Sequence, residues 1–401
     1  MPQDGLRPED VRWSAPRKRR VAVPAAIGVV ALGLAGLSSL SDAVARADFF
    51  RSYLTSFVFF LSLALGALVF VLMAHLMRAG WSVALRRVAE VVAWTLVPLA
   101  PLVLVVLFGM YDLYEWSHAE AVAQDALLQH KQVWLNPTFF VVRVLVYLAT
   151  WTLLATLLLR RSLAQDTTGD PLLTERSEAL AGPATIVFAF TVTFAAFDLV
   201  MSLDPHWYST IFGVYFFAGA FLGFCALLVV ILAALGRHSD IGRIVGVEHR
   251  HDLGKLMFAF VVFWAYIGFS QYMLIWYANL PEETIWYEAR QTGPWTAVSL
   301  LLLFGHFVAP FFVLMSRHPK RRHAVLVGAA VWLLAMHWLD LFWLVMPGAR
   351  TAGPLFRLVD VACFVGLGGL FLAAVAWRLG RVQLIPVRDP RLAESLEFEN
   401  A

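Results

Sequence analysis

The chain has 401 residues, of which 60% are hydrophobic and 15% are charged, and its formal net charge is +3. A soluble domain is nearer a quarter charged, so this composition excludes an ordinary soluble protein and favours a single helical membrane bundle. The two cysteines, Cys225 and Cys363, both lie within apolar segments. They are too few for a four-cysteine cluster and do not form a CxxCH haem attachment, so a redox centre would come from partner subunits or from histidine-ligated haem.

Ten apolar segments follow one another along the chain. They cover about residues 21–40, 52–77, 88–110, 138–159, 183–203, 208–235, 256–280, 294–316, 324–346 and 356–377. Unpaired backbone groups are not tolerated in lipid, and the segments lack barrel-like alternation, so we predict that they are helices. We therefore expect an all-α integral membrane protein with about ten transmembrane helices at 21–380, an N-terminal segment at 1–20 and a tail at 381–401.

The basic residues predict an orientation for this bundle. Of the 31 lysines and arginines, 24 lie in the N-terminal segment, in alternate loops and in the tail, whereas six lie in the other loops and Arg143 lies within a segment. Cytoplasmic loops of membrane proteins are enriched in lysine and arginine. We therefore expect both termini to be cytoplasmic.

The first apolar segment has two interpretations. The basic run 17–20, the apolar stretch and the sequence Ala45-Arg46-Ala47 are typical of a signal peptide with its cleavage site. The stretch is long for that purpose, however, and its removal would leave nine spans. We favour a retained helix, and cleavage remains the alternative.

Ionisable residues at membrane depth are candidates for function because charge in hydrocarbon is costly. Their chain positions predict two sets of proton-accepting groups that line hydrated half-channels, with His306 between the sets. The outer set is Asp198, His337, Asp340 and Asp360, with Asp204 and His206 at its mouth, and the inner set is His75 and Glu90. The alternative is structural: buried ion pairs or hydrogen bonds that fix packing, with Arg143 as one partner, and snorkelling of His75 and Glu90 to the interface.

A histidine-ligated haem is a further alternative. His306 and His337 have comparable depth on adjacent segments, so one axial pair is geometrically possible. A second haem would need two more deep histidines, and His75 is too near the edge.

The stretch from Met257 to Tyr287 is unusually aromatic for a single span. Tyr266, Ser270, Gln271 and Asn279 place hydrogen-bonding groups among the aromatic residues, and the stretch ends in Leu-Pro-Glu-Glu-Thr at 280–284. A quinone head group needs such partners for its carbonyls and apolar or aromatic walls. The alternative is aromatic helix packing with an interfacial belt.

Two motifs resemble one known family. The stretch 263–284 (FWAYIGFSQYMLIWYANLPEET) and the stretch 197–210 (FDLVMSLDPHWYST) are similar to the F subunit of bacterial alternative complex III, and the size and span number agree along most of the chain. The resemblance implies a polysulfide-reductase-type membrane subunit with two four-helix bundles and flanking helices, in a bacterial inner membrane. It also implies that Asp198 belongs to a proton path.

The resemblance further implies an assembly that oxidises quinol. The expected partners are a multihaem cytochrome c subunit, an iron–sulfur/molybdopterin-like subunit and a related ten-span membrane subunit, with haem and iron–sulfur clusters only in those partners and no nucleic acid. This chain would be a non-catalytic subunit that frames or binds quinol and conducts protons. Two other classes remain open, namely a stand-alone secondary transporter and a structural membrane anchor for cytochrome subunits.

Overall fold

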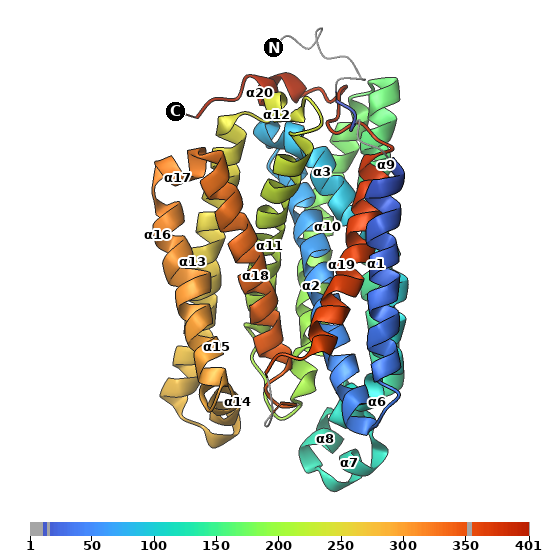
Figure 1. The fold of residues 1–401 in the computed structure, drawn as a ribbon, viewed down its shortest axis with the longest axis vertical. Coiled ribbons are helices and arrows are strands. Elements are labelled where there is room, and N and C mark those ends of the chain that lie inside the picture. Colours follow the sequence, from blue (N-terminus) through green and yellow to red (C-terminus); the bar gives the residue numbers. More distant parts are fainter. Residues whose placement is uncertain (1–10, 14–16, 351–354, 401) are drawn as a thin grey trace.

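The computed structural model describes residues 11–13, 17–350 and 355–400, so most of the N-terminal segment predicted at 1–20 lies outside the described residues. Within those ranges ten helices or helix runs are long and apolar enough to cross a membrane (Figure 1). The chain is therefore a multi-pass, all-α membrane protein. The spans are α1 (Arg17–Ser38), α2 (Ala43–Leu76), α3–α5 (Val83–Trp94, Leu96–Leu99 and Val103–Phe108), α9 (Pro137–Thr168), α10 (Leu172–Leu199), α11 (Phe212–Leu235), α13 (Val247–Ala278), α15–α16 (Trp295–Leu301 and Ala309–Met315), α18 (His323–Val345) and α19 (Leu358–Leu379).

The spans form two four-helix bundles and one flanking pair. Helices α2, α3, α9 and α10 contact one another in a closed ring, and α11, α13, α15–α16 and α18 form a second ring. Helix α2 also packs against α11 and α18, so it joins the two bundles, and α1 pairs with α19. This arrangement confirms the predicted fold class.

The flanking pair is held together by glycines. A Cβ atom on Gly28 of α1 would lie 2.7 Å from the carbonyl oxygen of Gly366 on α19, and one on Gly369 would lie 2.4 Å from the carbonyl oxygen of Pro24. Small residues at such positions let two membrane helices approach closely.

Two spans depart from regular α-helix, and proline accounts for both. The third span is divided at η3 (Ala100–Leu102), close to Pro98 and Pro101. The eighth span contains a π-helical segment, η6 (Leu302–Val308), immediately before Pro310. Because a proline ring clashes with the carbonyl group four residues earlier, here that of His306, the helix widens at this point.

Short helices cover the end of the bundle opposite the termini. The loop after the third span contains α6 (Met110–Leu113), η4 (Glu115–Ser117), α7 (Ala119–Gln124) and α8 (Ala126–Lys131), and α14 (Pro281–Gln291) follows the seventh span. Asp125 caps α8 by accepting hydrogen bonds from two backbone amides, at 2.8 and 3.1 Å, and so separates it from α7.

The two described ends of the chain meet at the other end of the bundle, which we call the termini end. The backbone N–H of Leu384 donates to the carbonyl oxygen of Val11 at 2.8 Å. Helices α12 (Ile241–Ile244), α17 (Arg317–Arg321) and α20 (Leu392–Leu396) lie at this end (Figure 1). Its loops are the basic ones, so we predict that it faces the cytoplasm.

Candidate functional site

A cavity of about 450 Å³ lies within the second bundle, beside the aromatic stretch singled out in the sequence. Its size falls within the range of small-molecule sites. Phe269 and Leu303 border it and are 61% and 49% exposed, so the cavity reaches the surface that would face lipid. Its lining consists of Tyr215, Trp264, Ala265, Gly268, Phe269, Gln271, Tyr272, Tyr287, Gln291, Ser299, Leu302, Leu303, Phe307 and Trp343.

The polar groups of this cavity gather around Gln271. Its amide oxygen accepts from the hydroxyl of Ser209 at 2.8 Å, and its amide nitrogen donates to the hydroxyl oxygen of Tyr287 at 3.0 Å. Burial raises the pKa of the Tyr287 phenol to about 12, so this group stays protonated at neutral pH. No hydrogen bond within the described chain uses the phenol hydrogen, which leaves it available as a donor to a ligand.

Two wall residues connect the cavity to a buried carboxylate. The phenol of Tyr215 and the indole N–H of Trp264 both donate to the side chain of Asp340, the latter at 3.1 Å. Asp340 is 2% exposed. It accepts hydrogen bonds from these two neutral groups and forms no ion pair within the described residues. A group bound in the cavity would therefore be one side chain away from a carboxylate without a countercharge.

His337 stands beside this carboxylate, one helical turn earlier on α18. Its Nε2 atom is 2.8 Å from the hydroxyl oxygen of Ser62, and that hydroxyl donates to the carbonyl oxygen of Phe59 at 2.7 Å. This bonding assigns the proton of the imidazole to Nε2 and leaves Nδ1 as an acceptor. Nδ1 is buried and has no partner in the described chain.

Two glycines of α11 make room for this imidazole. A Cβ atom on Gly219 would lie 3.1 Å from Nδ1 of His337 and 3.7 Å from a carboxylate oxygen of Asp340, and one on Gly223 would lie 2.8 Å from Cδ2 of His337. Their lack of side chains brings the free Nδ1 atom and the carboxylate to the same small space.

His306 completes the cluster from the π-helical segment. Its ring lies 4.1 Å from the ring of Trp264, centroid to centroid, and is fully buried. Neither ring nitrogen has a hydrogen-bond partner within the described residues. We call His306, His337 and Asp340, with Tyr215 and Trp264, the buried cluster. Both imidazole rings lie directly against protein groups, and a haem held between them would require those groups to move.

Asp198 lies in the first bundle, in a different environment. Two guanidinium nitrogens of Arg143 donate to its carboxylate at 2.8 Å each, the phenol of Tyr147 donates at 2.9 Å and the indole of Trp134 at 3.0 Å. The guanidinium also lies 4.1 Å from the centroid of the Trp134 ring. Both oxygens of this carboxylate are therefore satisfied, and the arrangement is typical of a structural ion pair. No hydrogen bond between described residues connects it to the buried cluster.

The other predicted intramembrane carboxylates are ion-paired. Asp360 accepts from Arg350 at 2.7 and 2.9 Å and from the hydroxyl of Ser52 at 2.6 Å, and it caps the first turn of α19. Glu90 lies between Arg86 and Arg87, at 3.4 and 3.2 Å. Glu90 is 1% exposed, so its side chain does not snorkel to the interface, and the two guanidinium groups compensate its charge where it is buried.

His75 is buried near the end of α2, and its side chain makes no hydrogen bond among the described residues. The structure thus separates the predicted inner pair, His75 and Glu90, from the buried cluster by several helical turns along α2 and α3.

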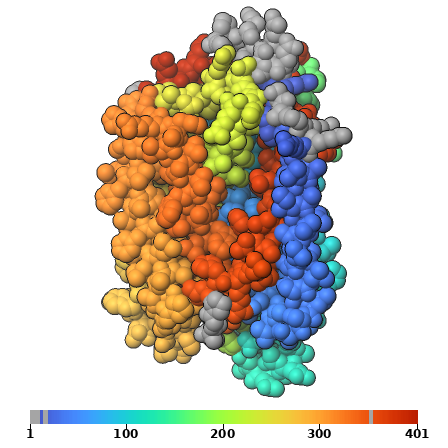
Figure 2. Space-filling view, viewed as in Figure 1, coloured from blue at the N-terminus to red at the C-terminus, as the bar shows by residue number. Residues whose placement is uncertain are grey.

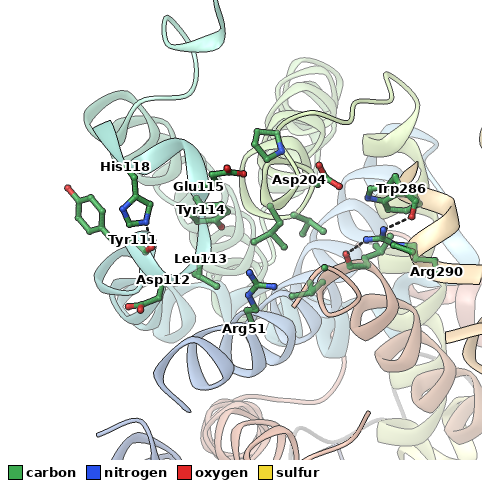
Figure 3. Close-up of a pocket in the computed structure, with 17 residues that line it drawn as sticks. Arg51, Tyr111, Asp112, Leu113, Tyr114, Glu115, His118, Asp204, Trp286 and Arg290 are labelled. Carbon is green, nitrogen blue, oxygen red and sulfur yellow. Dashed lines mark hydrogen bonds between the residues drawn. The ribbon is translucent and has the colours of Figure 1, made fainter. Parts of the chain in front are cut away.

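A second cavity, of about 470 Å³, opens at the end opposite the termini. Figure 3 shows it between Arg51 of α2, Arg290 and Trp286 of α14, and the loop that contains His118. Asp204 lines this cavity, whereas the outer set for which it was the predicted mouth residue does not. His206 does not line it: its Nε2 atom pairs with Asp125 at 2.6 Å, and this hydrogen bond is the largest cause of the lowered pKa of Asp125.

The four residues predicted to bind a quinone are distributed unequally. Gln271 lines the first cavity, whereas Tyr266 is 63% exposed on the outer side of the same helix. Ser270 is half-buried and has no side-chain hydrogen bond in the described chain, and Asn279 ends α13 in the left-handed conformation, with φ of 50°. Asn279 lines a neighbouring cavity of about 330 Å³ that shares Tyr287 with the first.

The fold and the site define a polytopic helical membrane protein with a lipid-accessible aromatic cavity beside a buried polar cluster. Comparison with protein-family models and with curated proteins found no match to the chain. The site residues that the sequence analysis missed are Tyr215, Trp264 and Tyr287. The sequence shows them as aromatic residues with a polar group, in or beside three spans. It does not indicate that Trp264 contacts Asp340.

Proposed function

We propose that this chain is an integral membrane subunit of a bacterial respiratory quinol:cytochrome c, or quinol:acceptor, oxidoreductase, and that its first cavity holds the quinol ring. One observation carries the proposal: Tyr215 and Trp264 form the cavity wall and also donate hydrogen bonds to Asp340. A lipid-soluble substrate that loses protons needs an apolar site with a proton acceptor behind its wall. The two motifs similar to alternative complex III subunits support the same class.

The cavity offers suitable groups for the substrate. The Tyr287 hydroxyl is a free donor and Gln271 fixes its position, so a quinol oxygen would bind there, while Trp264 and Phe307 flank the ring. Exposed Phe269 and Leu303 mark the entrance from the bilayer. The substrate would thus enter sideways from the membrane without crossing water.

The proton balance follows from the hydrogen bonds. Oxidation of a quinol releases two electrons and two protons. The phenol of Tyr215 passes its hydrogen to Asp340 while it accepts one from a quinol hydroxyl, so that the phenol is unchanged and the carboxylate gains one proton. The unpartnered Nδ1 of His337 then takes this proton from Asp340, because Gly219 leaves both groups facing the same space, and the carboxylate is free to accept the second quinol proton by the same route.

The electrons would leave through partner subunits. We propose a multihaem cytochrome c subunit, an iron–sulfur/molybdopterin-like subunit and a related ten-span subunit as partners, in a bacterial inner membrane with this chain's termini cytoplasmic. In this assembly Asp198 has a structural role, and proton transfer depends on the buried cluster.

Two experiments test the proposal. Mild-detergent isolation of the tagged chain from native membranes should also bring down subunits with haem c and iron–sulfur signals. Isolation of the chain alone, or as its own oligomer, would instead favour a stand-alone transporter.

The second experiment blocks the cavity. Ala265→Phe places a large side chain in the lining, and we expect it to raise the KM for quinol in the isolated complex at least tenfold. Val262→Phe is the matched control, because Val262 is on the same helix but is 37% exposed and outside the lining. Equal kinetics for both variants would contradict a quinol site in this cavity.

A further inference from the structure

A small cavity with a basic rim lies at the termini end of the second bundle. Its volume is about 200 Å³, and it is enclosed by the last turns of α11, by α12, by the first turns of α13 and by the start of α18. The chain between α11 and α13 forms part of the cavity wall, and some of it is visible as the yellow-green surface in Figure 2. The cavity therefore sits where two spans leave the membrane.

The lining divides into an apolar floor and a basic rim. Val229, Leu232 and Leu253 form the floor and are almost completely buried. Arg237, Arg250 and His323 line the cavity above them, and no acidic residue belongs to the lining. Apolar groups below and two guanidinium groups above match the boundary between acyl chains and head groups.

Neither rim arginine has a carboxylate partner among the described residues, although acids are near in the sequence. Asp240 is 3.8 Å from Arg243, Glu248 binds Arg321 at 2.5 Å and Asp252 binds Lys255 at 2.5 Å, so these acids are occupied elsewhere.

Arg237 and His323 are exposed and make no side-chain hydrogen bond within the described chain. Arg250 donates to the carbonyl oxygen of Val245 at 2.9 Å, but its Nε atom is buried without a partner. The rim thus has unused donors and uncompensated positive charge.

Two glycines keep the space open. A Cβ atom on Gly236 would lie 3.2 Å from Cα of Gly242, and one on Gly242 would lie 3.0 Å from the carbonyl oxygen of Gly236. Both residues line the cavity. Any larger residue at either position would force the loop away from α11 or reduce the cavity.

We propose that this cavity binds the phosphate head group of an anionic phospholipid. Arg237, Arg250 and His323 bind the phosphate oxygens, and the first methylene groups of the lipid lie on the floor formed by Val229 and Leu232. The remainder of the acyl chains continues along the membrane surface of the bundle. Clusters of basic residues at the ends of spans recognise anionic lipids in this way. The lipid would fix the loop between α11 and α13, the two helices that carry Tyr215 and Trp264.

The test is native mass spectrometry of the full chain, or of the complex that contains it, titrated with short-chain phosphatidylglycerol or phosphatidylcholine. We expect retention of phosphatidylglycerol and not of phosphatidylcholine. Each basic residue near an anionic lipid contributes a factor of about five. The double variant Arg237→Gln/Arg250→Gln should therefore weaken phosphatidylglycerol binding by roughly 25-fold. If it does not, or if both lipids bind equally, the proposal is wrong.

Three further variants make the test specific. Arg243→Gln removes the same charge from the same loop but outside the lining, and it should leave binding unchanged. Ala233 also lines the cavity, and Ala233→Phe would fill it while retaining the charges, so this variant should also prevent lipid binding. Arg237→Gln alone changes an exposed residue, and its expected loss of about fivefold decides the matter if the double variant does not fold. Displacement of phosphatidylglycerol by millimolar inorganic phosphate would assign the site to free phosphate and overturn the lipid proposal.

Discussion

The variant Asp198→Asn tests whether this carboxylate has a structural role or conducts protons. In Asp198→Asn one of the two oxygens becomes an NH₂ group, which cannot accept from Arg143, Tyr147 or Trp134. Two of the four hydrogen bonds to this side chain, which span 2.8–3.0 Å, involve the guanidinium. The variant therefore leaves a guanidinium that is only 6% exposed without its countercharge.

The expected cost follows from the broken pair. Removal of one partner of a buried ion pair typically costs about 3–5 kcal/mol, and we expect Asp198→Asn to lower the free energy of unfolding by about that amount. The double variant Arg143→Met/Asp198→Asn removes the charge on both sides, and the remaining amide oxygen still accepts from Tyr147. We therefore expect the double variant to lose only about 1–2 kcal/mol, less than the single variant.

The assay is reversible unfolding in mixed micelles titrated with SDS, and the quantity compared is the free energy of unfolding. Asp42→Asn is the matched control, because Asp42 caps α2 by accepting from the amide of Ala45 at 2.8 Å and asparagine caps equally well. It should stay within about 0.5 kcal/mol of the wild type. If Asp198→Asn is as stable as this control but lowers proton release during quinol oxidation, Asp198 belongs to a proton path and our interpretation is wrong.

Three further predictions concern the buried cluster and the loop after the third span. Gly223→Ala should cost about 1–3 kcal/mol in the same unfolding assay, because its Cβ atom would lie 2.8 Å from the cluster's imidazole. Gly36→Ala, which meets nothing within 4 Å, should cost nothing, and equal losses would refute the packing argument. Tyr215→Phe should lower kcat for quinol oxidation at least tenfold and Tyr266→Phe should not; unchanged turnover in both would remove the phenol from the proton path. The Asp125 pKa is lowered from 3.8, so its carboxylate stabilises the loop at neutral pH, and this contribution is lost as the pH falls through the lowered pKa. Hydrogen exchange at residues 119–131, corrected for intrinsic rates, should rise below that pH, and pH-independent protection would contradict this.

The sequence predicted the helical architecture well because length and apolarity are properties of one segment at a time. Ten spans, their approximate limits and their helical nature follow from the physics of the bilayer. The predicted helix ends were less accurate. Helix α2 begins at Ala43, about nine residues before the predicted apolar segment, because its first turns contain the charged residues Arg46, Asp48 and Arg51 and do not belong to the apolar run. The sequence analysis did not anticipate that Asp125 caps a new helix, α8, in the middle of the loop after the third span.

The candidate site was harder to predict because it depends on which helix faces which. The depth of an ionisable residue can be counted along a span, and this identified His306, His337 and Asp340. The side of the helix on which such a residue lies, and the residue that it contacts, cannot be read from the sequence in this way. Asp198 stood in the more distinctive motif, yet Arg143 satisfies it, whereas Asp340 receives only neutral donors.

Gln271 and Tyr287 illustrate the same limit. They are 16 positions apart and belong to different helices, and only the turn at Asn279 brings them together at 3.0 Å. In the sequence, Tyr287 was indistinguishable from an aromatic residue of the membrane interface. The effect of one proline is easier to infer from the sequence, because a proline at position 310 disturbs the helical hydrogen bonding four residues earlier, at His306.

The central claim is that quinol binds between α13, α14 and the eighth span, with the buried cluster behind it. Photolabelling of the isolated complex with a photoreactive quinone, followed by peptide mapping, tests it most directly. We predict labels within residues 264–272 and 287–303, which decrease with excess quinol and in Ala265→Phe but persist in Val262→Phe. Labels found only in partner subunits, or equally on the exposed Tyr266 and Trp276, would contradict the claim.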